Sequence, residues 1–308
     1  MKDGTNTPLK INSISEFHQS MSLKKPKHPL ISLVNFKDIV KHKDEVLREF
    51  VFGFYTIAIK KDFKGKFKYG QNHYDFDEGV MSFISPGQLL SESNANEDPI
   101  SGHLLMFHPD FLRGYALEEK LMTMGFFSYS LCEALYLSED EQQMIEGVMN
   151  NIGTEYNSSI DLYSQDVMIS HLEVLLNYSN RFYNRQFITR KHINNDLLAN
   201  LEKELNSYMD SNASQNEGLP TVQMLSKKLN VSPSYLSDML KGLTGLTVQQ
   251  HIQEKLIDKA KTLLSTTSLR VAEVAYLLGF EHPQSLNRIF KKKTDVSPLQ
   301  YRRSFFKN

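Results

Sequence analysis

The chain has very little cysteine: among its 308 residues, only Cys132 carries a thiol. A single cysteine excludes an intramolecular disulfide and a cysteine-rich metal cluster. The run around it, SLCEALYL, is largely apolar, so we interpret Cys132 as a small buried side chain rather than a nucleophile. This cysteine content favours a protein of a reducing compartment.

Long apolar runs and targeting signals are lacking as well. No stretch approaches the roughly 20 apolar residues of a membrane-spanning helix. The opening residues, MKDGTNTPLKINS, have no apolar core of the kind found in signal peptides. The sequence therefore predicts a cytoplasmic location and no membrane partner.

Motifs for catalysis and cofactor binding are also missing. Closely spaced histidines beside a carboxylate would suggest a metal site, whereas His73, His103 and His108 are scattered and no His-x-His triplet occurs. No glycine-rich phosphate loop is present, and the Asp/Glu pairs lie in polar segments where they are expected to be solvated. We therefore expect no catalytic residue, no metal, no cofactor and no enzymatic activity.

Charge is distributed unevenly along a chain of otherwise ordinary composition, and its length suffices for two domains. Hydrophobic residues make up 40% and charged residues 23%. Residues 219–308 hold 14 Lys and Arg against 6 Asp and Glu, a net of +8, which leaves a net of −9 in residues 1–218. A basic C-terminal part behind an acidic N-terminal part is typical of a nucleic-acid-binding module attached to a sensor domain, although charges also segregate by chance.

One sequence pattern occurs twice, as LSKKLNVSPSYLSDMLK at 225–241 and VAYLLGFEHPQSLNRIFK at 274–291. Each copy begins with a short apolar helix and then turns at residue types that tolerate a left-handed backbone. Each continues into a helix opened by a proline, Pro233 or Pro283, which is a favoured first-turn residue. Two helices joined by a tight turn, with the second one amphipathic, are the signature of a helix-turn-helix motif.

The outward faces of the two second helices carry side chains that suit DNA. Apolar residues at i, i+3 and i+4 define the inward face, and polar residues fall between them. The candidates for DNA contact are Ser234, Tyr235, Ser237, Asp238 and Lys241 in the first helix, and Gln284, Asn287, Arg288, Lys291 and Lys292 in the second. Arginine can bind guanine with two hydrogen bonds, and asparagine or glutamine can bind adenine in the same way. Any surface helix carries polar residues, but two copies in register favour base recognition.

The C-terminal part resembles the AraC/XylS-type transcriptional regulators over residues 192–308. The matching positions are Gly245, Thr247, Ile252, Leu256, Ala260, Leu263, Leu264, Val271, Val274, Ala275, Gly279, Phe280, the run Leu286–Lys292, Val296, Ser297, Pro298, Tyr301 and Arg302. Three residues depart from the family pattern: Lys255 replaces an arginine, Asp295 a glycine, and Asp238 a basic residue. A carboxylate at Asp238 repels phosphate, although it can accept a hydrogen bond from a cytosine amine.

The N-terminal part is rich in predicted strands between about 30 and 115, with turns at residues 77–79 and 85–87. The resemblance implies a cupin-like β-barrel that binds an effector. Aromatic residues on the predicted strands suit either a cavity for a small apolar effector or simply the barrel core. The candidate effector-binding residues are Phe52, Phe54, Tyr55, Tyr74 and Phe83.

Together these features predict an α+β chain: a cupin-like β-barrel followed by helices, then an all-α domain with two helix-turn-helix motifs. We expect a loose arm over residues 1–28 and an exposed loop at 211–218. The predicted segments are an effector domain at 1–136, a helical dimerisation segment at 137–183, a linker at 184–191 and a DNA-binding domain at 192–308. Within the last, the motifs are predicted at about 221–242 and 270–292, joined by a connecting helix at 247–264.

The predicted function is sequence-specific DNA binding by a homodimeric transcriptional regulator controlled by a small effector. Helices 233–242 and 283–292 would enter successive major-groove segments of double-stranded DNA. Candidates for phosphate contacts are Lys227, Lys228, Lys292, Lys293, Arg302 and Arg303. Two alternatives stay open: a cupin-type binding protein or enzyme with a DNA-binding tail, and an architectural DNA binder without a ligand. The resemblance implies that the helices at 137–183 dimerise, and packing on the barrel is the alternative.

Overall fold

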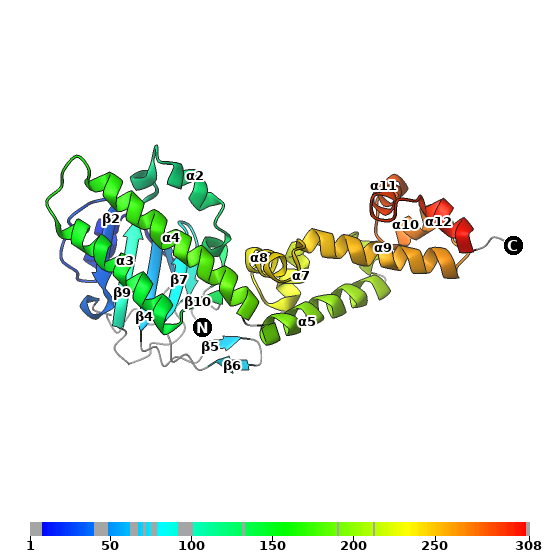
Figure 1. The fold of residues 1–308 in the computed structure, drawn as a ribbon, viewed down its shortest axis with the longest axis horizontal. Coiled ribbons are helices and arrows are strands. Elements are labelled where there is room, and N and C mark those ends of the chain that lie inside the picture. The colour runs from blue at the N-terminus through cyan, green and yellow to red at the C-terminus, as the bar shows by residue number, and fades with distance from the viewer. Residues whose placement is uncertain are drawn as a thin grey trace, which may run out of the picture. The chain divides into compact units, whose positions relative to one another are not determined.

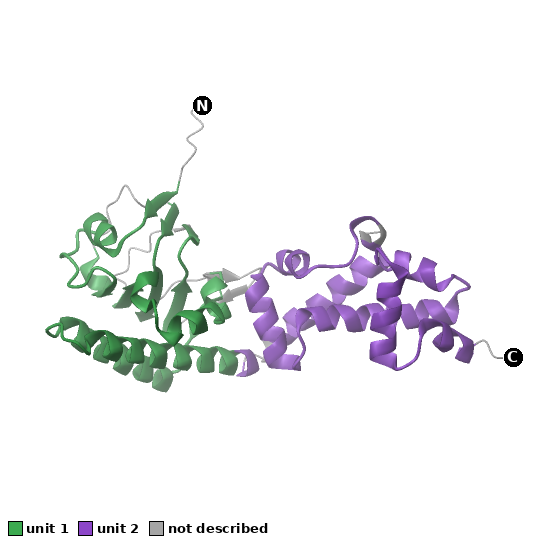
Figure 2. Cartoon of the chain, turned by 90° about the horizontal axis from the view of Figure 1, so that it is seen from above, with its two compact units in different colours: residues 1–186 green, residues 187–308 purple. Residues whose placement is uncertain are grey.

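The structure, a computed structural model, describes residues 8–39, 49–61, 67–69, 72–74, 79–91, 101–130, 133–189, 191–211 and 213–305. The chain divides into two compact units, Met1–Gln186 and Phe187–Asn308 (Figure 2). Cys132 and the predicted turn residues 77–78 lie outside the described residues.

Within its described residues, the N-terminal unit combines ten short strands with four α-helices (Figure 1). Its strands are β1 (Leu9–Ile11), β2 (Ile31–Asn35), β3 (Glu49–Phe52), β4 (Tyr55–Lys61), β5 (Phe67–Tyr69), β6 (Asn72–Tyr74), β7 (Val80–Ile84), β8 (Leu89–Ser91), β9 (Ser101–Phe107) and β10 (Leu135–Tyr136). Its helices are α1 (Ile14–Ser20), α2 (Ala116–Met122), α3 (Glu139–Asn157) and most of α4 (Ser164–Thr189).

The strands form separate sheets. A five-stranded antiparallel sheet has the order β10-β7-β4-β9-β2, and a three-stranded sheet has the order β1-β3-β8 with β1 parallel to β3. The strands β5 and β6 pair only with each other. Within the described ranges none of these sheets closes on itself, so the mixed α+β class holds while the predicted barrel is not seen.

The first residues differ from the loose arm that we expected. The strand β1 pairs with β3, from Leu9 opposite Phe50 to Ile11 opposite Phe52. The helix α1 then begins at a capping box in which the Ser13 side chain accepts from the Glu16 backbone N–H and Glu16 accepts from the Ser13 backbone N–H. Burial explains the difference, because this segment supplies three apolar side chains to the core.

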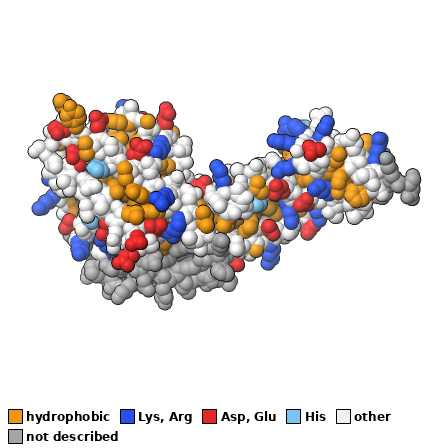
Figure 3. Space-filling model, in the orientation of Figure 1, with side chains coloured by type: hydrophobic (Ala, Val, Ile, Leu, Met, Phe, Trp, Pro, Cys, Tyr) orange, Lys and Arg blue, Asp and Glu red, His pale blue; other side chains and the backbone are white. Residues whose placement is uncertain are grey.

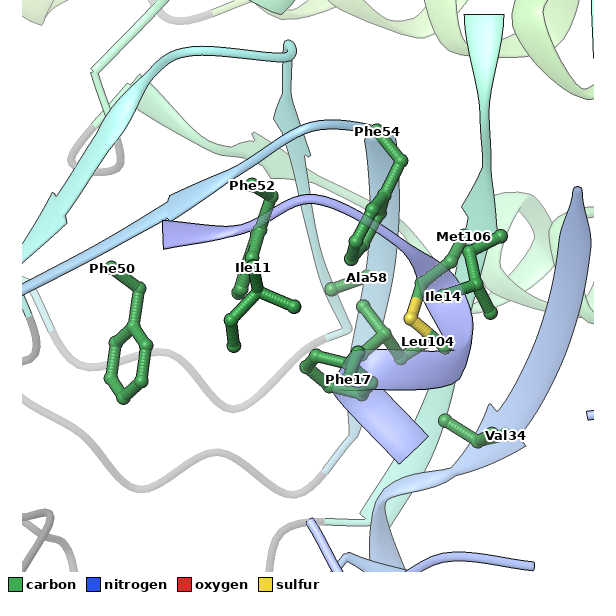
Figure 4. Packing of buried hydrophobic residues seen from close by; sticks show 10 residues of the cluster. All are labelled: Ile11, Ile14, Phe17, Val34, Phe50, Phe52, Phe54, Ala58, Leu104 and Met106. Atoms are coloured by element: carbon green, nitrogen blue, oxygen red, sulfur yellow. The ribbon is translucent and has the colours of Figure 1, made fainter. Parts of the chain in front are cut away.

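That core lies between α1, the small sheet and one face of the large sheet. Figure 4 shows its packed side chains, which come from Ile11, Ile14, Phe17, Val34, Phe50, Phe52, Phe54, Ala58, Leu104 and Met106. The Phe52 and Phe54 rings stack with centroids 5.2 Å apart, and Phe17 meets both edge-on. The helices α3 and α4 lie against the large sheet (Figure 1). The predicted helix opening at Ser138 is confirmed by a capping box with Glu141.

The predicted linker at 184–191 is helical for most of its length, because α4 continues to Thr189 and α5 begins at Lys191. Although this segment is polar in composition, the side chains of Gln186 and Phe187 are buried, each 2% exposed. The Gln186 amide accepts a hydrogen bond from the Tyr136 N–H (2.8 Å) and donates one to the Ala134 carbonyl (3.2 Å). Tertiary contacts therefore order a segment whose composition suggests a linker.

The regular secondary structure of the C-terminal unit, within its described residues, consists of helices. Its helices are α5 (Lys191–Asp210), α6 (Ala213–Glu217), α7 (Val222–Leu229), α8 (Pro233–Thr244), α9 (Val248–Thr266), α10 (Val271–Leu277), α11 (Pro283–Thr294) and α12 (Pro298–Phe305). The predicted exposed loop at 211–218 contains the helix α6. Ser214 in this segment is buried, and its hydroxyl donates a hydrogen bond to the Leu277 carbonyl at 3.0 Å. The helices α7 and α8 lie at one end of α9, and α10 to α12 lie at the other (Figure 1).

Candidate nucleic-acid interface

The first helix-turn-helix motif is formed by α7 and α8. The Thr221 hydroxyl caps α7 by accepting from the Met224 N–H at 3.2 Å. The helix ends at Asn230, whose φ of 56° and ψ of 42° are the left-handed conformation predicted from its residue type. The Ser232 hydroxyl then accepts from the Tyr235 N–H at 3.1 Å, and Pro233 opens α8. Local capping thus defines both ends of this turn.

The second motif, α10 and α11, depends on a glycine in its turn. Gly279 has a φ of +86°, and a Cβ on it would lie 2.6 Å from the Ser214 carbonyl oxygen and 2.7 Å from that of Gly218. Neither the backbone conformation nor the space therefore admits a larger residue. At the far end, Asp295 caps α11 with a φ of 61°. The usual glycine of the family suits this left-handed cap, and aspartate is among the few other residues that adopt it.

The two outward faces differ in exposure. On α11, Gln284, Asn287, Arg288, Lys291 and Lys292 are all exposed, and Lys and Arg side chains gather over this helix (Figure 3). On α8, Lys241 is exposed, whereas Ser234, Tyr235, Ser237 and Asp238 are only partly exposed. Buried residues on the inward sides hold both helices: Leu236, Met239 and Leu240 in α8, and Leu286 and Phe290 in α11. The structure thus brings five of the ten candidates together on one open, basic face.

The six candidates for phosphate contact fall into two groups. Three are engaged inside the unit: Lys228 pairs with Glu204 (3.1 Å), Lys293 pairs with Glu254 (3.3 Å), and Arg302 Nε donates to the Leu264 carbonyl (3.2 Å). The other three, Lys227, Lys292 and Arg303, are exposed and have no ion pair within the part of the chain that the structure describes. The second group is better placed to meet a polyanion.

The candidate effector-binding aromatics do not converge on one space. Phe52 and Phe54 belong to the core beneath α1, together with Ala58 of β4. Phe83 pairs with Ile57, and because neighbouring residues of a strand point to opposite faces, it lies on the other side of the sheet from Ala58. There Phe83 packs against Phe126, with ring centroids 4.7 Å apart.

The remaining two aromatic candidates are Tyr55 and Tyr74. Tyr55 is partly exposed, and its ring stacks on Phe107 at 5.2 Å. Burial, and to a smaller extent the charge of Glu118, raises the pKa of the Tyr55 hydroxyl. The side chain of Tyr74 lies outside the described residues.

Among the residues that the structure describes, no three His, Cys, Asp or Glu side chains lie where they could hold a metal ion together. No described helix combines the length and the apolar character needed to cross a membrane.

One residue of this unit was missed by sequence reasoning. Phe187 precedes the predicted DNA-binding domain, yet its ring packs edge-on against Tyr235 of α8, with centroids 5.5 Å apart. The available signal was its i+4 spacing from Tyr183 on a helix that we had expected to end there.

The C-terminal unit is similar in sequence to known proteins. A family model described as a helix-turn-helix domain matches residues 225–304. The arabinose operon regulatory protein of Escherichia coli (strain K12) is 38% identical over 72 residues, which are 23% of this chain and 25% of that protein. The HTH-type transcriptional regulator YijO of the same organism is 32% identical over 85 residues, 28% of this chain and 30% of YijO. The chain thus matches less than a third of the length of either regulator.

Among solved structures, the C-terminal domain of the two-component response regulator yesN from Fusobacterium nucleatum is 35% identical. That match covers 33% of this chain and 98% of the solved domain, with a TM-score of 0.29. The C-terminal unit, with its two helix-turn-helix motifs, is of the type found in AraC/XylS-type transcriptional regulators.

Proposed function

We propose that the chain is a sequence-specific DNA-binding transcriptional regulator. The observation that carries this proposal is the face of α11, where a guanidinium, two amides and two ammonium groups stand exposed on the second helix of a helix-turn-helix motif. Arg288 is suited to guanine, and Gln284 and Asn287 are suited to adenine. The exposed lysines at the end of this helix supply the electrostatic part of binding, which does not depend on sequence.

The connecting helix supports contact with two major-groove segments. The 19 residues of α9 give it a length of about 28 Å, and the two motifs pack at its opposite ends. Successive major-groove segments on one face of DNA are about 34 Å apart. The helices α8 and α11 would therefore occupy adjacent segments, with α11 carrying more of the base contacts because its face is the more exposed.

The test is selection of duplexes by the full chain from a random double-stranded pool. A regulator of this kind should enrich a motif with two conserved blocks about one helical turn apart, and should bind it far more tightly than random duplex. Enrichment of no motif, with equal affinity for all duplexes, would support the architectural alternative instead.

We further propose that the chain forms a homodimer through α4. The apolar residues of α3 and α4 split into two sets: Ile145, Val148, Leu172, Leu175 and Leu176 are buried against the unit, whereas Met144, Val167 and Val174 are exposed. Val167 and Val174 are seven residues apart, so they lie on the same side of the helix. Sedimentation of the full chain and of Val174→Asp tests this proposal, because the charge should shift a dimer towards monomer. A wild-type chain that stays monomeric at high micromolar concentration would contradict it.

We also propose that the N-terminal unit is an effector domain related to cupins, with no enzymatic role. The AraC/XylS-type C-terminal unit and the strand-rich fold of the N-terminal unit support this proposal. Because Phe52, Phe54 and Phe83 are buried, the partly exposed Tyr55 is the described candidate with a surface left for a ligand. Titration of the full chain with small aromatic and apolar compounds, followed by thermal unfolding and DNA binding, is the test. A stoichiometric metal in the purified protein would favour the enzyme alternative.

A further inference from the structure

We infer that Phe187 is a positioning residue for DNA recognition, which holds the first recognition helix, α8, in its orientation. The inference rests on the proposed function and deepens it. Phe187 lies upstream of residues 225–304, the region that matches the family model, so the shared domain does not include it. It also precedes the DNA-binding domain predicted from the sequence, although it packs inside the C-terminal unit.

The Phe187 side chain spans two turns of α8. Its ring meets the Tyr235 ring at a centroid distance of 5.5 Å and an interplanar angle of 74°. A Cβ placed on Gly242 would lie 3.4 Å from the Phe187 Cβ, an ordinary van der Waals distance, so Gly242 lies beside Phe187 at the other end of the contact. Tyr235 and Gly242 are seven residues apart and share one side of α8. The contact therefore covers most of the length of this helix.

The backbone carbonyl of Phe187 also has a partner within the C-terminal unit. The Asn194 side chain, 2% exposed, donates a hydrogen bond to the Phe187 carbonyl at 2.6 Å. Carbonyls in the last turn of a helix lack an intrahelical partner, so a buried amide at this point satisfies one of them. Phe187 is itself 2% exposed. Both ends of the residue are thus fixed within the C-terminal unit.

The location of the contact explains why it would affect base recognition. At about 100° per residue, the side of α8 that carries Tyr235 and Gly242 lies roughly a quarter turn from the side that carries Ser234 and Asp238. The ring therefore flanks the DNA-facing side without covering it. A helix held on its core side and on one flank cannot easily rotate about its axis, and that rotation decides which side chains face the groove.

The experiment compares full-length wild type, Phe187→Ala and Phe187→Leu on a duplex that the wild type selects from a random pool. Binding to single-base variants of this duplex shows which base is preferred at each position. The block of base pairs where Arg288→Ala loses preference is the one that α11 contacts. Phe187→Ala should lose on the order of tenfold in affinity, with preference lost in the other block and kept in the α11 block. The affinity of Phe187→Leu should lie between those of Phe187→Ala and wild type. The leucine variant keeps the test valid if the alanine variant folds poorly.

Phe182→Ala is the matched control, since it removes a buried ring (4% exposed) from the same helix, where Phe182 stacks on Tyr178. This variant should lower stability but leave both blocks of the profile intact. The inference is overturned if Phe187→Ala has the wild-type profile, if both blocks weaken equally, or if Phe182→Ala reproduces its profile. A wild type that selects no duplex refutes the proposed function, and the inference with it.

Discussion

Lys293 Nζ lies 3.3 Å from Glu254 Oε1, so this lysine ties the C-terminal end of α11 to α9. Its neighbour Lys292 is exposed and makes no ion pair within the described ranges. Two adjacent residues of one type therefore have different surroundings. The pair allows a comparison in which residue type and helix position are nearly constant.

Lys292→Ala should weaken binding to specific and random duplexes by the same factor and reduce the slope of log affinity against log salt by about 1. The reason is the loss of one phosphate contact, which releases a counterion. Lys293→Ala should change the salt slope less, because its ammonium is engaged with Glu254. Fluorescence anisotropy at several salt concentrations measures both slopes. Equal slopes for the two variants would contradict the distinction.

Arg288→Ala should weaken binding to the selected duplex much more than binding to random duplex. Arg288 is exposed on the outward face of α11, where a guanidinium can form two hydrogen bonds to guanine. The loss should be about 1–3 kcal/mol, with relaxed preference at one base pair. Competition binding with single-base variants measures it. If the loss is the same on both kinds of DNA, Arg288 contacts only phosphate.

Gly279→Ala should strongly destabilise the C-terminal unit. The alanine would need a left-handed backbone, at about 1–2 kcal/mol, and its Cβ would meet two carbonyl oxygens at 2.6 and 2.7 Å. Gly245→Ala is the control, because Gly245 has a similar φ of +74° with nothing within 4 Å of the added atom. Chemical denaturation should show the smaller, purely conformational loss for Gly245→Ala. Equal losses would mean that the turn relaxes around the new side chain.

Phe54→Ala should lower the free energy of unfolding of the N-terminal unit by about 3–5 kcal/mol, because the ring is fully buried and stacked on Phe52. Leu89→Ala, at a side chain that is 50% exposed, should change it by about 0.5 kcal/mol or less. Denaturant titration measures both. A Phe54→Ala chain with unchanged stability and a lost effector response would restore the cavity-lining role for this ring.

Acidification should destabilise the N-terminal unit through His103. Burial, assisted by the nearby charge of Lys61, lowers the pKa of His103 below its usual 6.5, while Glu146 acts in the opposite direction. As the pH falls below 6.5, the unfolded chain therefore takes up this proton first, and stability declines until the folded-state pKa is reached. His103→Gln should show a smaller drop in melting temperature between about pH 7 and pH 5. Parallel curves for the two proteins would exclude His103 as the source.

Local pattern was enough to predict the two helix-turn-helix motifs. Asn230 and Gly279 occupy left-handed turns, Pro233 and Pro283 open the second helices, and the buried positions of α8 and α11 follow the expected spacing. These features depend on backbone conformation and helix periodicity, which a short stretch of sequence determines by itself. The similarity of the C-terminal unit to AraC/XylS-type regulators rests on the same residues.

Tertiary structure alone decided the features that depend on long-range contacts. A polar segment became helical because Gln186 and Phe187 are buried by partners far away in the chain, and the expected arm folded because Ile14 and Phe17 fill the core. Phe52 and Phe83 were separated onto opposite faces by the pairing of their strands. Burial and ion pairing depend on which distant residues come together, and neither composition nor periodicity records that. The sequence therefore determined which residues are candidates for DNA contact, and the packing determined which of these candidates are exposed.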